Sequence, residues 1–447
     1  MKRFFLLMVL MGSIQAFAQN QYLASGPMLG YNELREVMVW VQTTEAALVG
    51  MEYWDKGNPD VLFKSNLVRT EKHKGFTAHL LADQVLPGRS YGYRVLINTD
   101  YIERPYPLEF TVQTDWLYHA PPPDFKIALG SCTYINDTPF DRNGTPYGGE
   151  YQIFESIADQ EPDLMFWLGD NTYYRPADET SLTGMLHRNS HTRKTPEMQR
   201  LLATAHNYAI WDDHDYGPND SDRSFIYKER AQKVFEYFWA NPSYGLDGKG
   251  CTAQFKYNDV DVFMLDNRYF RTPNNEKEGE ITLLGERQLE WFIEALINSR
   301  ARYKLVMIGG QVVSNAAKFE NYANQHAEER KYLLQRIEKE NVKGVVFLTG
   351  DRHHTEMSML TNGAGNTVLD LTISPLTSGA SRGNGDEGNE HQIAGTYVGN
   401  RNFGTLEFTG PANERKMTIS VFDSDGQLLW LKAVQPGKER NLELVKE

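Results

Sequence analysis

Three apolar runs each end in a turn rich in carboxylates, and this feature constrains the fold of the chain more than any other. The runs are LMFWLGD at 164–170, YAIWDDHD at 208–215 and VVFLTGDRHH at 345–354. Each run predicts a strand buried on both faces. In open α/β sheets, ligands bind outside the carboxyl ends of the strands. Because converging carboxylates repel one another, we expect a metal centre between these strand ends.

The first residues of the chain predict a targeting segment. Lys2 and Arg3 precede an apolar stretch at 4–11, and Ala-Phe-Ala at 16–18 forms a small-x-small cleavage site. No Cys follows to carry a lipid anchor, and no later segment is apolar enough to span a membrane. We therefore expect a signal peptide at 1–18 and a mature protein that is periplasmic or secreted.

A length of 447 residues predicts two or three domains. Residues 20–117 alternate as an all-β region, in which a turn at 86–90 precedes Tyr91-x-Tyr93. This turn is similar to the tyrosine corner of an immunoglobulin or fibronectin type III sandwich, with Trp40 as a candidate core residue. The prolines at 121–123 predict a stiff linker, followed by a second domain at 124–434.

In the second domain, strand and helix patterns alternate. Expected helices cover 152–157, 228–239, 286–299 and 327–340, and expected strands cover 260–265, 304–308, 345–348 and 368–372, with further β-structure at 405–431. Two polar insertions, at 175–206 and 379–402, read as loops that form walls or lids over the site.

Charge and motif content exclude several classes of function. The formal net charge of −13 argues against binding to a nucleic-acid backbone. Neither a Gly-x-Ser-x-Gly elbow nor a P-loop pattern is present.

The two cysteines, Cys132 and Cys251, leave two alternatives open. In an exported protein their spacing slightly favours a disulfide, whereas the position of Cys132 after an apolar run suits a metal-binding thiolate.

The first two turns offer oxygen and imidazole ligands. Asp170 and Tyr173 face one cation if the turn is helical, although helix capping and core packing would use the same residues. The turn at 212–215 contains Asp213 and His214 and reads either as a metal-binding turn or as a solvated acidic one. Asn219 and Asp220 add oxygen donors suited to calcium or magnesium.

The third turn combines Asp351, Arg352 and His353. A bridging carboxylate with an imidazole suits a two-metal centre, and a guanidinium suits a phosphate dianion. The alternative is a structural Asp–Arg pair with an exposed His. Other cations are weaker candidates for substrate contacts, because they serve equally well as ion-pair partners or solvated surface: Arg268, Arg271, His187, Arg188, His191 and Arg193.

Taken together, these segments resemble the alkaline phosphatase D (PhoD-like) metallophosphatases. The resemblance covers about residues 120–430. It rests on GSC at 130–132, GDxxY at 169–173, WDDHDYGxND at 211–220, LDxR at 265–268, LGxxQxxW at 284–291, GDxH at 350–353 and NFG at 402–404. It implies an α+β fold, an αββα metallophosphatase-like sandwich behind an immunoglobulin- or fibronectin-like domain.

The same resemblance implies the cofactors Fe3+ and Ca2+. Carried across, Cys132, Asp170, Tyr173 and His353 would face iron, which makes Cys132 a free thiolate. Asp170, Asp351 and an Asn would face calcium. Asn219 is the best match for the Asn, although spacing in the family differs there by a residue.

The expected function is hydrolysis of small phosphate esters, either monoesters or diesters, by metal-activated hydroxide. Arg268 or Arg352 would clamp the phosphate, and Asp213 and His214 would orient the nucleophile or protonate the leaving group. A phosphodiesterase or phospholipase is the nearest alternative. A non-catalytic surface-binding protein with structural calcium is an alternative of another class.

Overall fold

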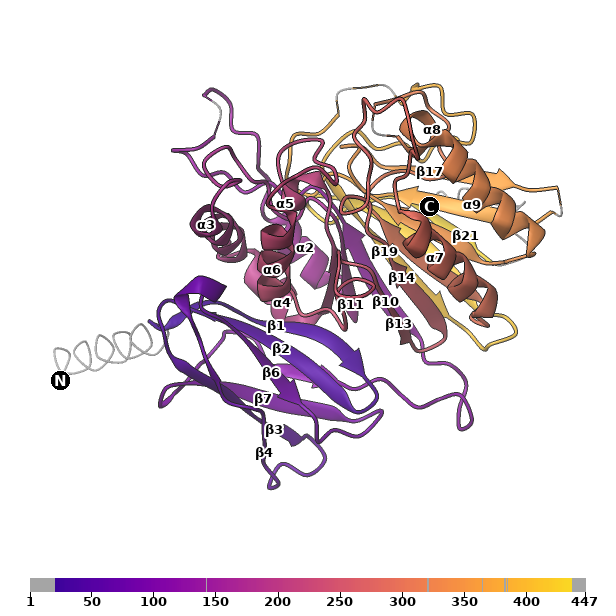
Figure 1. Ribbon diagram of the computed structural model, residues 1–447. Coiled ribbons are helices and arrows are strands. Elements are labelled where there is room, and N and C mark those ends of the chain that lie inside the picture. The colour runs from indigo at the N-terminus through magenta and orange to yellow at the C-terminus, as the bar shows by residue number, and fades with distance from the viewer. Residues whose placement is uncertain are drawn as a thin grey trace, which may run out of the picture.

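The computed structural model describes residues 21–435 except 142, 320, 364, 382 and 384 (Figure 1). The predicted signal peptide at 1–18 lies outside the described residues. Within the described part of the chain, no helix has both the length and the apolar character needed to cross a membrane.

The first of three sheets has nine strands in the order β21-β20-β19-β10-β11-β12-β1-β2-β6. Its bounds are β1 Leu23–Glu33, β2 Glu36–Thr43, β6 Thr77–Ala82, β10 Phe125–Gly130, β11 Leu164–Leu168, β12 His206–Ile210, β19 Asn402–Thr409, β20 Lys416–Asp423 and β21 Leu428–Val434. Strands β10, β11 and β12 are parallel, so their carboxyl ends meet at one edge. Every residue of β11 and β12 is buried, as the unbroken apolar run of β11 predicts, although β12 begins with the polar residues His206 and Asn207.

The second sheet has the order β13-β14-β15-β16-β18-β17. Its bounds are β13 Ala253–Tyr257, β14 Val260–Met264, β15 Tyr303–Ile308, β16 Val345–Thr349, β17 Glu356–Thr361 and β18 Thr367–Thr372. This sheet packs face to face on the first, since the rings of Tyr208 and Phe255 stack with centroids 4.0 Å apart. Phe125 and Tyr257 also meet across the two sheets, edge to face, with ring centroids 5.2 Å apart. The two sheets therefore enclose one apolar core.

Helices cover the outer faces of both sheets. Helices α7 (Glu286–Asn298) and α9 (Ala327–Lys339) lie together on the second sheet, as Figure 1 shows in orange. The predicted stripe of α7 is buried there: Leu289, Phe292, Ile293 and Leu296. Helices α2 (Ile153–Asp159), α4 (Met198–Thr204) and α6 (Lys228–Phe238) pack with the first sheet. The short helices α5 (Asp213–Tyr216) and α8 (Tyr322–Gln325) complete these helix–sheet–sheet–helix layers.

The insertion at 175–206 is helical, so the prediction of a loop there was wrong. Helix α3 (Leu182–Arg193) begins at Ser181, whose hydroxyl accepts a hydrogen bond from the Gly184 amide. It buries polar side chains, among them Arg188 and Asn189. Because hydrogen bonds rather than an apolar stripe hold this helix, its sequence lacks the usual periodic signal.

The N-terminal region consists of two β-layers, as its alternation predicts. The third sheet contains β3 Leu48–Asp55, β4 Phe63–Lys64, β5 Val68–Arg69, β7 Ser90–Ile97, β8 Asp100–Tyr101 and β9 Glu109–Thr111. It packs on β1, β2 and β6 around a separate apolar cluster. The Tyr91 hydroxyl accepts a hydrogen bond from the Leu86 amide at 2.9 Å, the contact that defines a tyrosine corner. Trp40 does not belong to this cluster: it is buried against Phe238 of α6, on the opposite face of β2.

The two regions share one sheet, because β1 lies parallel to β12. His206 is buried at this junction. Its Nδ1 lies 2.8 Å from the Gly30 carbonyl oxygen, and its Nε2 lies 3.0 Å from the Asn32 amide nitrogen. Since a carbonyl can only accept, Nδ1 carries the proton and Nε2 accepts from Asn32. The junction therefore requires a neutral imidazole.

We expect this junction to weaken in acid. Burial lowers the pKa of His206 from 6.5 to about 4, so the unfolded chain binds more protons between these values. Its contribution to stability is complete above pH 6.5 and decreases as the pH falls toward 4, by about 3 kcal/mol in all. Urea unfolding at pH 7.5 and 4.5 measures the change. His206→Gln should show a smaller difference between the two pH values, and equal differences would contradict the assignment.

Candidate metal centre

The carboxyl ends of both sheets bring the predicted ligands to one place. Cys132 follows β10, Asp170 follows β11, Asp213 follows β12, and Asp351 and His353 follow β16. Potential ligand atoms lie within 4.8 Å of one another in three overlapping groups. These are Cys132–Asp170–His353, Asp170–Asp213–His214 and Asp212–Asp213–Asp351. Asp170 and Asp213 each belong to two groups, so the three form one continuous cluster.

Tyr173 adds a phenol to the thiol, carboxylate and imidazole of the first group. The Cys132 sulfur lies 3.6 Å from an Asp170 oxygen, and the Tyr173 hydroxyl donates to the same oxygen at 3.0 Å. The same hydroxyl lies 3.3 Å from Nε2 of His353. Ser374 donates to the Cys132 sulfur at 3.2 Å. Four different kinds of donor therefore face one small volume.

Four of these residues adopt a left-handed backbone conformation. The φ angles are 60° at Cys132, 54° at Asp170, 68° at Asp351 and 54° at His353. This region is unfavourable for residues with a side chain, at a cost of order 1–3 kcal/mol each. Such conformations concentrate at functional sites, where they direct side chains that a regular strand end would point elsewhere.

The second part of the cluster is built on α5. Asp212 caps this helix, and Asp215 completes the capping box by accepting the Asp212 amide at 3.0 Å. Asp215 therefore accepts hydrogen bonds from the backbone, while Asp213 and His214 project into the cluster. Among the described residues, Asp213 Oδ1 and His214 Nδ1 are buried with no hydrogen-bond partner. Buried polar atoms of this kind call for a further ligand.

Arg268 is the counter-ion of this acidic turn. It is 2% exposed, it donates through Nε to Asp212, and its Nη2 lies 3.6 Å from Asp213. Asn267 donates to the same Asp212 oxygen at 2.8 Å. Although burial opposes ionisation, the charges of Arg268 and His214 hold the pKa of Asp213 below its usual value. Asp213 is therefore a carboxylate.

The other carboxylate and the thiol lack such compensation. Burial, with the charges of Asp213 and Cys132, raises the pKa of Asp170 well above its usual range. Burial raises the pKa of the Cys132 thiol to about 12. A cation between these groups would reverse both effects. Thiolate, phenolate and imidazole suit a transition metal, and the carboxylates suit a hard cation, so the residues fit a two-metal centre.

Several predicted residues lie outside the cluster. Asn219 is exposed, although the backbone amide of its neighbour Asp220 donates to Asp213 at 2.7 Å. Arg352 forms an ion pair with Glu387 at 2.6 Å. Arg271 donates to Asn274 at 2.7 Å, on the loop that follows β14.

The cations of the first insertion have structural partners. His187 and Arg188 lie 3.0 Å and 3.7 Å from Asp137, and Arg188 also donates to Asp178 at 2.8 Å. His191 contacts the Asn136 carbonyl oxygen at 2.8 Å. Arg193 is buried over the ring of Trp239, 3.7 Å from its centroid. The contacts with Asn136 and Asp137 hold α3 against the loop that follows β10, and Arg193 holds it against the residue that follows α6.

Both cysteines are free and buried, so the disulfide that the sequence slightly favoured is absent and the alternative of a free Cys132 thiol is confirmed. The Cys251 backbone amide donates to Asp266 at 2.9 Å. Asp266 also accepts the amides of Arg268 and Tyr269, both at 2.8 Å. The carboxylate in the LDxR segment therefore shapes a turn, and Arg268 is directed from that turn to the cluster.

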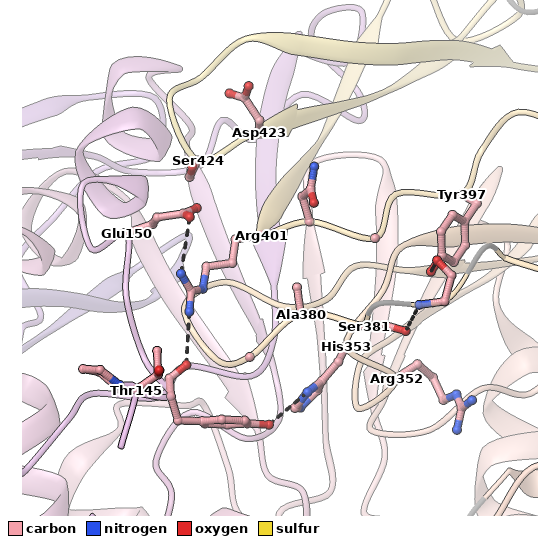
Figure 2. Close-up of a pocket in the computed structure, with 16 residues that line it drawn as sticks. Thr145, Glu150, Arg352, His353, Ala380, Ser381, Tyr397, Arg401, Asp423 and Ser424 are labelled. Atoms are coloured by element: carbon pink, nitrogen blue, oxygen red, sulfur yellow. Dashed lines mark hydrogen bonds and ion pairs between the residues drawn. The ribbon is translucent and has the colours of Figure 1, made fainter. Parts of the chain in front are cut away.

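A cleft of about 1380 Å3 opens beside the cluster at His353 (Figure 2). The second insertion supplies much of its wall, through Ser381, Tyr397 and Arg401, as expected for that segment. In Figure 2, Arg352 lies at one end of the cleft, and Asp423 and Ser424 lie at the other. The cleft gives a substrate access to the imidazole edge of the cluster.

Three residues of the site escaped prediction from the sequence: Asn267, Ser374 and Tyr147. Asn267 follows the same strand as Arg268, and its position at a strand end was an available signal. Ser374 and Tyr147 lie 242 and 206 residues from the side chains that they contact. Only the fold brings these pairs together.

Sequence comparison identifies relatives of the chain. A family model described as PhoD-like phosphatase matches residues 127–413. Alkaline phosphatase D of Bacillus subtilis (strain 168) is 23% identical over 334 residues, which cover 64% of this chain and 54% of the relative. The chain thus spans about half the length of that relative.

Solved structures share the fold. A structure of PhoD superposes with a TM-score of 0.78 at 16% identity, covering 96% of this chain and 92% of the other. A purple acid phosphatase from yellow lupin (Lupinus luteus) seeds superposes with a TM-score of 0.64 at 12% identity, covering 92% and 74%. The chain therefore has a metallophosphatase-like mixed α/β fold.

Proposed function

Because this chain belongs to the PhoD-like phosphatase family, we propose that it is a metal-dependent phosphoric ester hydrolase with its centre at the cluster around Asp170. The observation that carries the proposal is the meeting of Cys132, Asp170, Asp213 and His353 within overlapping 4.8 Å groups. Membership of a phosphatase family supports an enzyme over the alternative of a non-catalytic surface-binding protein.

We assign Fe3+ to the group formed by Cys132, Asp170, Tyr173 and His353, because thiolate and phenolate favour a transition metal. We assign Ca2+ to Asp170 and Asp351. Asp213 supports calcium binding better than the predicted Asn219, since Asp213 is buried in the cluster and Asn219 is exposed. When bound, the two metals would supply an acidified water and neutralise phosphoryl oxygens.

In the reaction, a water oxygen forms a bond to phosphorus as the ester P–O bond breaks. One proton leaves the water, and one reaches the departing oxygen. His214 is placed to transfer such a proton, because its imidazole lies in the same group as Asp170 and Asp213, and its Nδ1 has no hydrogen-bond partner among the described residues. Asp213, held as a carboxylate by Arg268, orients the nucleophile.

The two arginines of the site have different roles in this proposal. Arg268 is buried on Asp212 and Asp213 and acts by positioning them, so it does not reach into the cleft. Arg352 lines the cleft beside His353 and is the candidate phosphate clamp. To serve as the clamp, it must exchange its ion pair with Glu387 for one with substrate.

The substrate is a small phosphate ester. A cleft of this size has room for a substituent on either side of the phosphorus, so diesters are included with monoesters, and a phospholipase activity is the nearest variant. We further propose an exported enzyme with an N-terminal immunoglobulin- or fibronectin-like domain. The tyrosine-corner hydrogen bond of Tyr91 supports that assignment.

Metal analysis with a substrate panel tests the proposal. We expect iron and calcium in the purified protein, an absorption band from thiolate or phenolate charge transfer, and hydrolysis of p-nitrophenyl mono- or diesters. Cys132→Ala should lose the iron and the band, whereas Cys251→Ala, the matched change at the other buried thiol, should retain both. Wild-type protein that binds neither metal and hydrolyses no ester would refute it.

A further inference from the structure

One side chain of the cleft wall reaches a proposed metal ligand. The Tyr147 hydroxyl lies 3.1 Å from Nδ1 of His353. The other ring nitrogen, Nε2, faces the Tyr173 hydroxyl at 3.3 Å and therefore the group that includes Asp170. The His353 ring is thus held between the cluster on one side and Tyr147 on the other.

The backbone around Tyr147 is fixed by close packing. Gly148 lies so close to the backbone of Tyr134 that a Cβ at this position would be 2.3 Å from the Tyr134 carbonyl oxygen. The Gly149 amide donates to the Thr377 carbonyl at 3.0 Å. Gly379 lies against the Tyr147 ring, where a Cβ would come within 2.6 Å of Cε2. Glycines thus bring this segment close to the residues that follow β18.

Arg401 clamps the same segment from the cleft side. Its Nη2 donates to the Tyr147 carbonyl at 3.1 Å, its Nε donates to the Ser378 carbonyl at 2.9 Å, and its Nη1 pairs with Glu150 at 3.3 Å. Figure 2 shows this chain of contacts leading from Glu150 through Arg401 toward His353. The ring of Tyr134 adds an edge contact, with centroids 4.9 Å apart.

This arrangement has a defined consequence for the imidazole. A histidine that binds a metal through Nε2 carries its proton on Nδ1, and a hydrogen-bond acceptor at Nδ1 fixes both the tautomer and the ring orientation. The Tyr147 oxygen is at hydrogen-bond distance from Nδ1 and can accept that proton. Loss of such an outer partner typically costs 10–100-fold in metal affinity or activity.

We propose that Tyr147 is a positioning residue that orients His353 toward the iron site from the wall of the substrate cleft. The proposal deepens the proposed function and rests on it. Tyr147 is 38% exposed and lines the cleft, so the residue that holds this proposed metal ligand is also within reach of a bound substrate. Iron binding therefore depends on the position of a residue in the cleft wall.

Tyr147→Phe tests the proposal, because it removes the hydroxyl and keeps the ring that packs on Tyr134. We expect iron to be lost to EDTA at least about 10-fold faster than from wild type, with the time course followed by elemental analysis. We also expect kcat for p-nitrophenyl phosphate or its diester to decrease by about 10-fold with KM nearly constant. The unfolding midpoint of the metal-free protein should not change.

Tyr397→Phe is the matched control. Tyr397 also lines the cleft, but its hydroxyl donates to the Gly383 carbonyl at 3.0 Å and is not bonded to His353. This variant should retain iron as wild type does. If Tyr147→Phe retains iron normally and raises only KM, Tyr147 contacts substrate and the positioning role is wrong. A wild-type protein that binds neither metal and hydrolyses no ester would instead refute the proposed function, so the two failures are distinguishable.

Discussion

Asp170→Asn is expected to abolish hydrolysis while making the metal-free protein more stable. Asp170 is shared by two ligand groups and would contact both metals. Its loss therefore removes several kcal/mol of the stabilisation that the metals would give to the transition state. We expect kcat/KM to decrease by at least about 1,000-fold. The amide preserves the shape of the side chain, and its Oδ1 can still accept the His214 amide, now 3.3 Å away.

The gain in stability has an electrostatic cause. Burial and the charges of Asp213 and Cys132 raise the pKa of Asp170, so the ionised form is unfavourable in the absence of metal. A neutral amide avoids this repulsion, and replacements that relieve such functional strain commonly add about 0.5–2 kcal/mol. Urea unfolding at pH 8 in EDTA measures the difference.

Asp163→Asn provides the control for this result. Asp163 immediately precedes the same strand, β11, at the end away from the cluster, and it accepts the Lys126 amide at 2.8 Å. This change should leave activity and iron content at wild-type levels. An Asp170→Asn protein that retained activity, or that was less stable than wild type in EDTA, would contradict the assignment of Asp170 as the shared ligand.

Removal of Arg268 is expected to have the largest effect on folding. Arg268→Ala leaves Asp212 and Asp213 buried without their guanidinium partner. Loss of one member of a buried ion pair typically costs about 3–5 kcal/mol. We expect a decrease of that order in the free energy of unfolding, measured by urea titration in EDTA.

Calcium should partly restore the stability of Arg268→Ala. A divalent cation between Asp213 and Asp351 supplies positive charge where the guanidinium has been removed, and a ligand that binds only the folded state stabilises it. The shift of the unfolding midpoint on adding millimolar Ca2+ should therefore be larger for the variant than for wild type. An equal or smaller shift would contradict a cation site at these carboxylates.

Arg352→Ala is the comparison that separates positioning from substrate binding. The Arg352–Glu387 pair is more exposed, at 14% and 26%, and such pairs contribute about 0–1 kcal/mol. For Arg352→Ala we expect a nearly unchanged free energy of unfolding and a higher KM. For Arg268→Ala we expect a lower free energy of unfolding and a nearly unchanged KM. A higher KM with normal stability for Arg268→Ala would restore the role of phosphate clamp that its sequence context suggests.

The sequence predicted the parts of the fold that have a local pattern. Apolar runs such as 164–168 became buried strands, and the stripe on α7 became a buried helix face. Both patterns depend only on neighbouring residues. Helix α3 was missed because it is held by buried polar contacts, such as that of Arg188 with Asp178. The prediction of a disulfide was wrong because the fold sets the distance between Cys132 and Cys251, and their spacing in the sequence does not reveal that distance.

The candidate site was predicted as a set of strand ends but not as a geometry. The turn at 212–215 identified Asp213 and His214, yet only the short helix α5 shows that these two face the cluster while Asp215 binds the backbone. The choice of Asn219 rested on spacing, which ignores that the chain reaches the surface there. The left-handed conformations at Cys132 and Asp351 have no sequence signal, since neither residue is Gly.

The parallel pairing of β1 with β12 also bears on how the protein can be divided. A fragment beginning at the proline linker would lack β1, and β12 would become the edge of its sheet. A normally buried strand whose backbone groups are left unpaired at an edge is a template for association with other chains. We therefore expect such a fragment to aggregate rather than to fold as an independent unit, because the N-terminal strands cover the edge of the sheet that carries the proposed metal ligands.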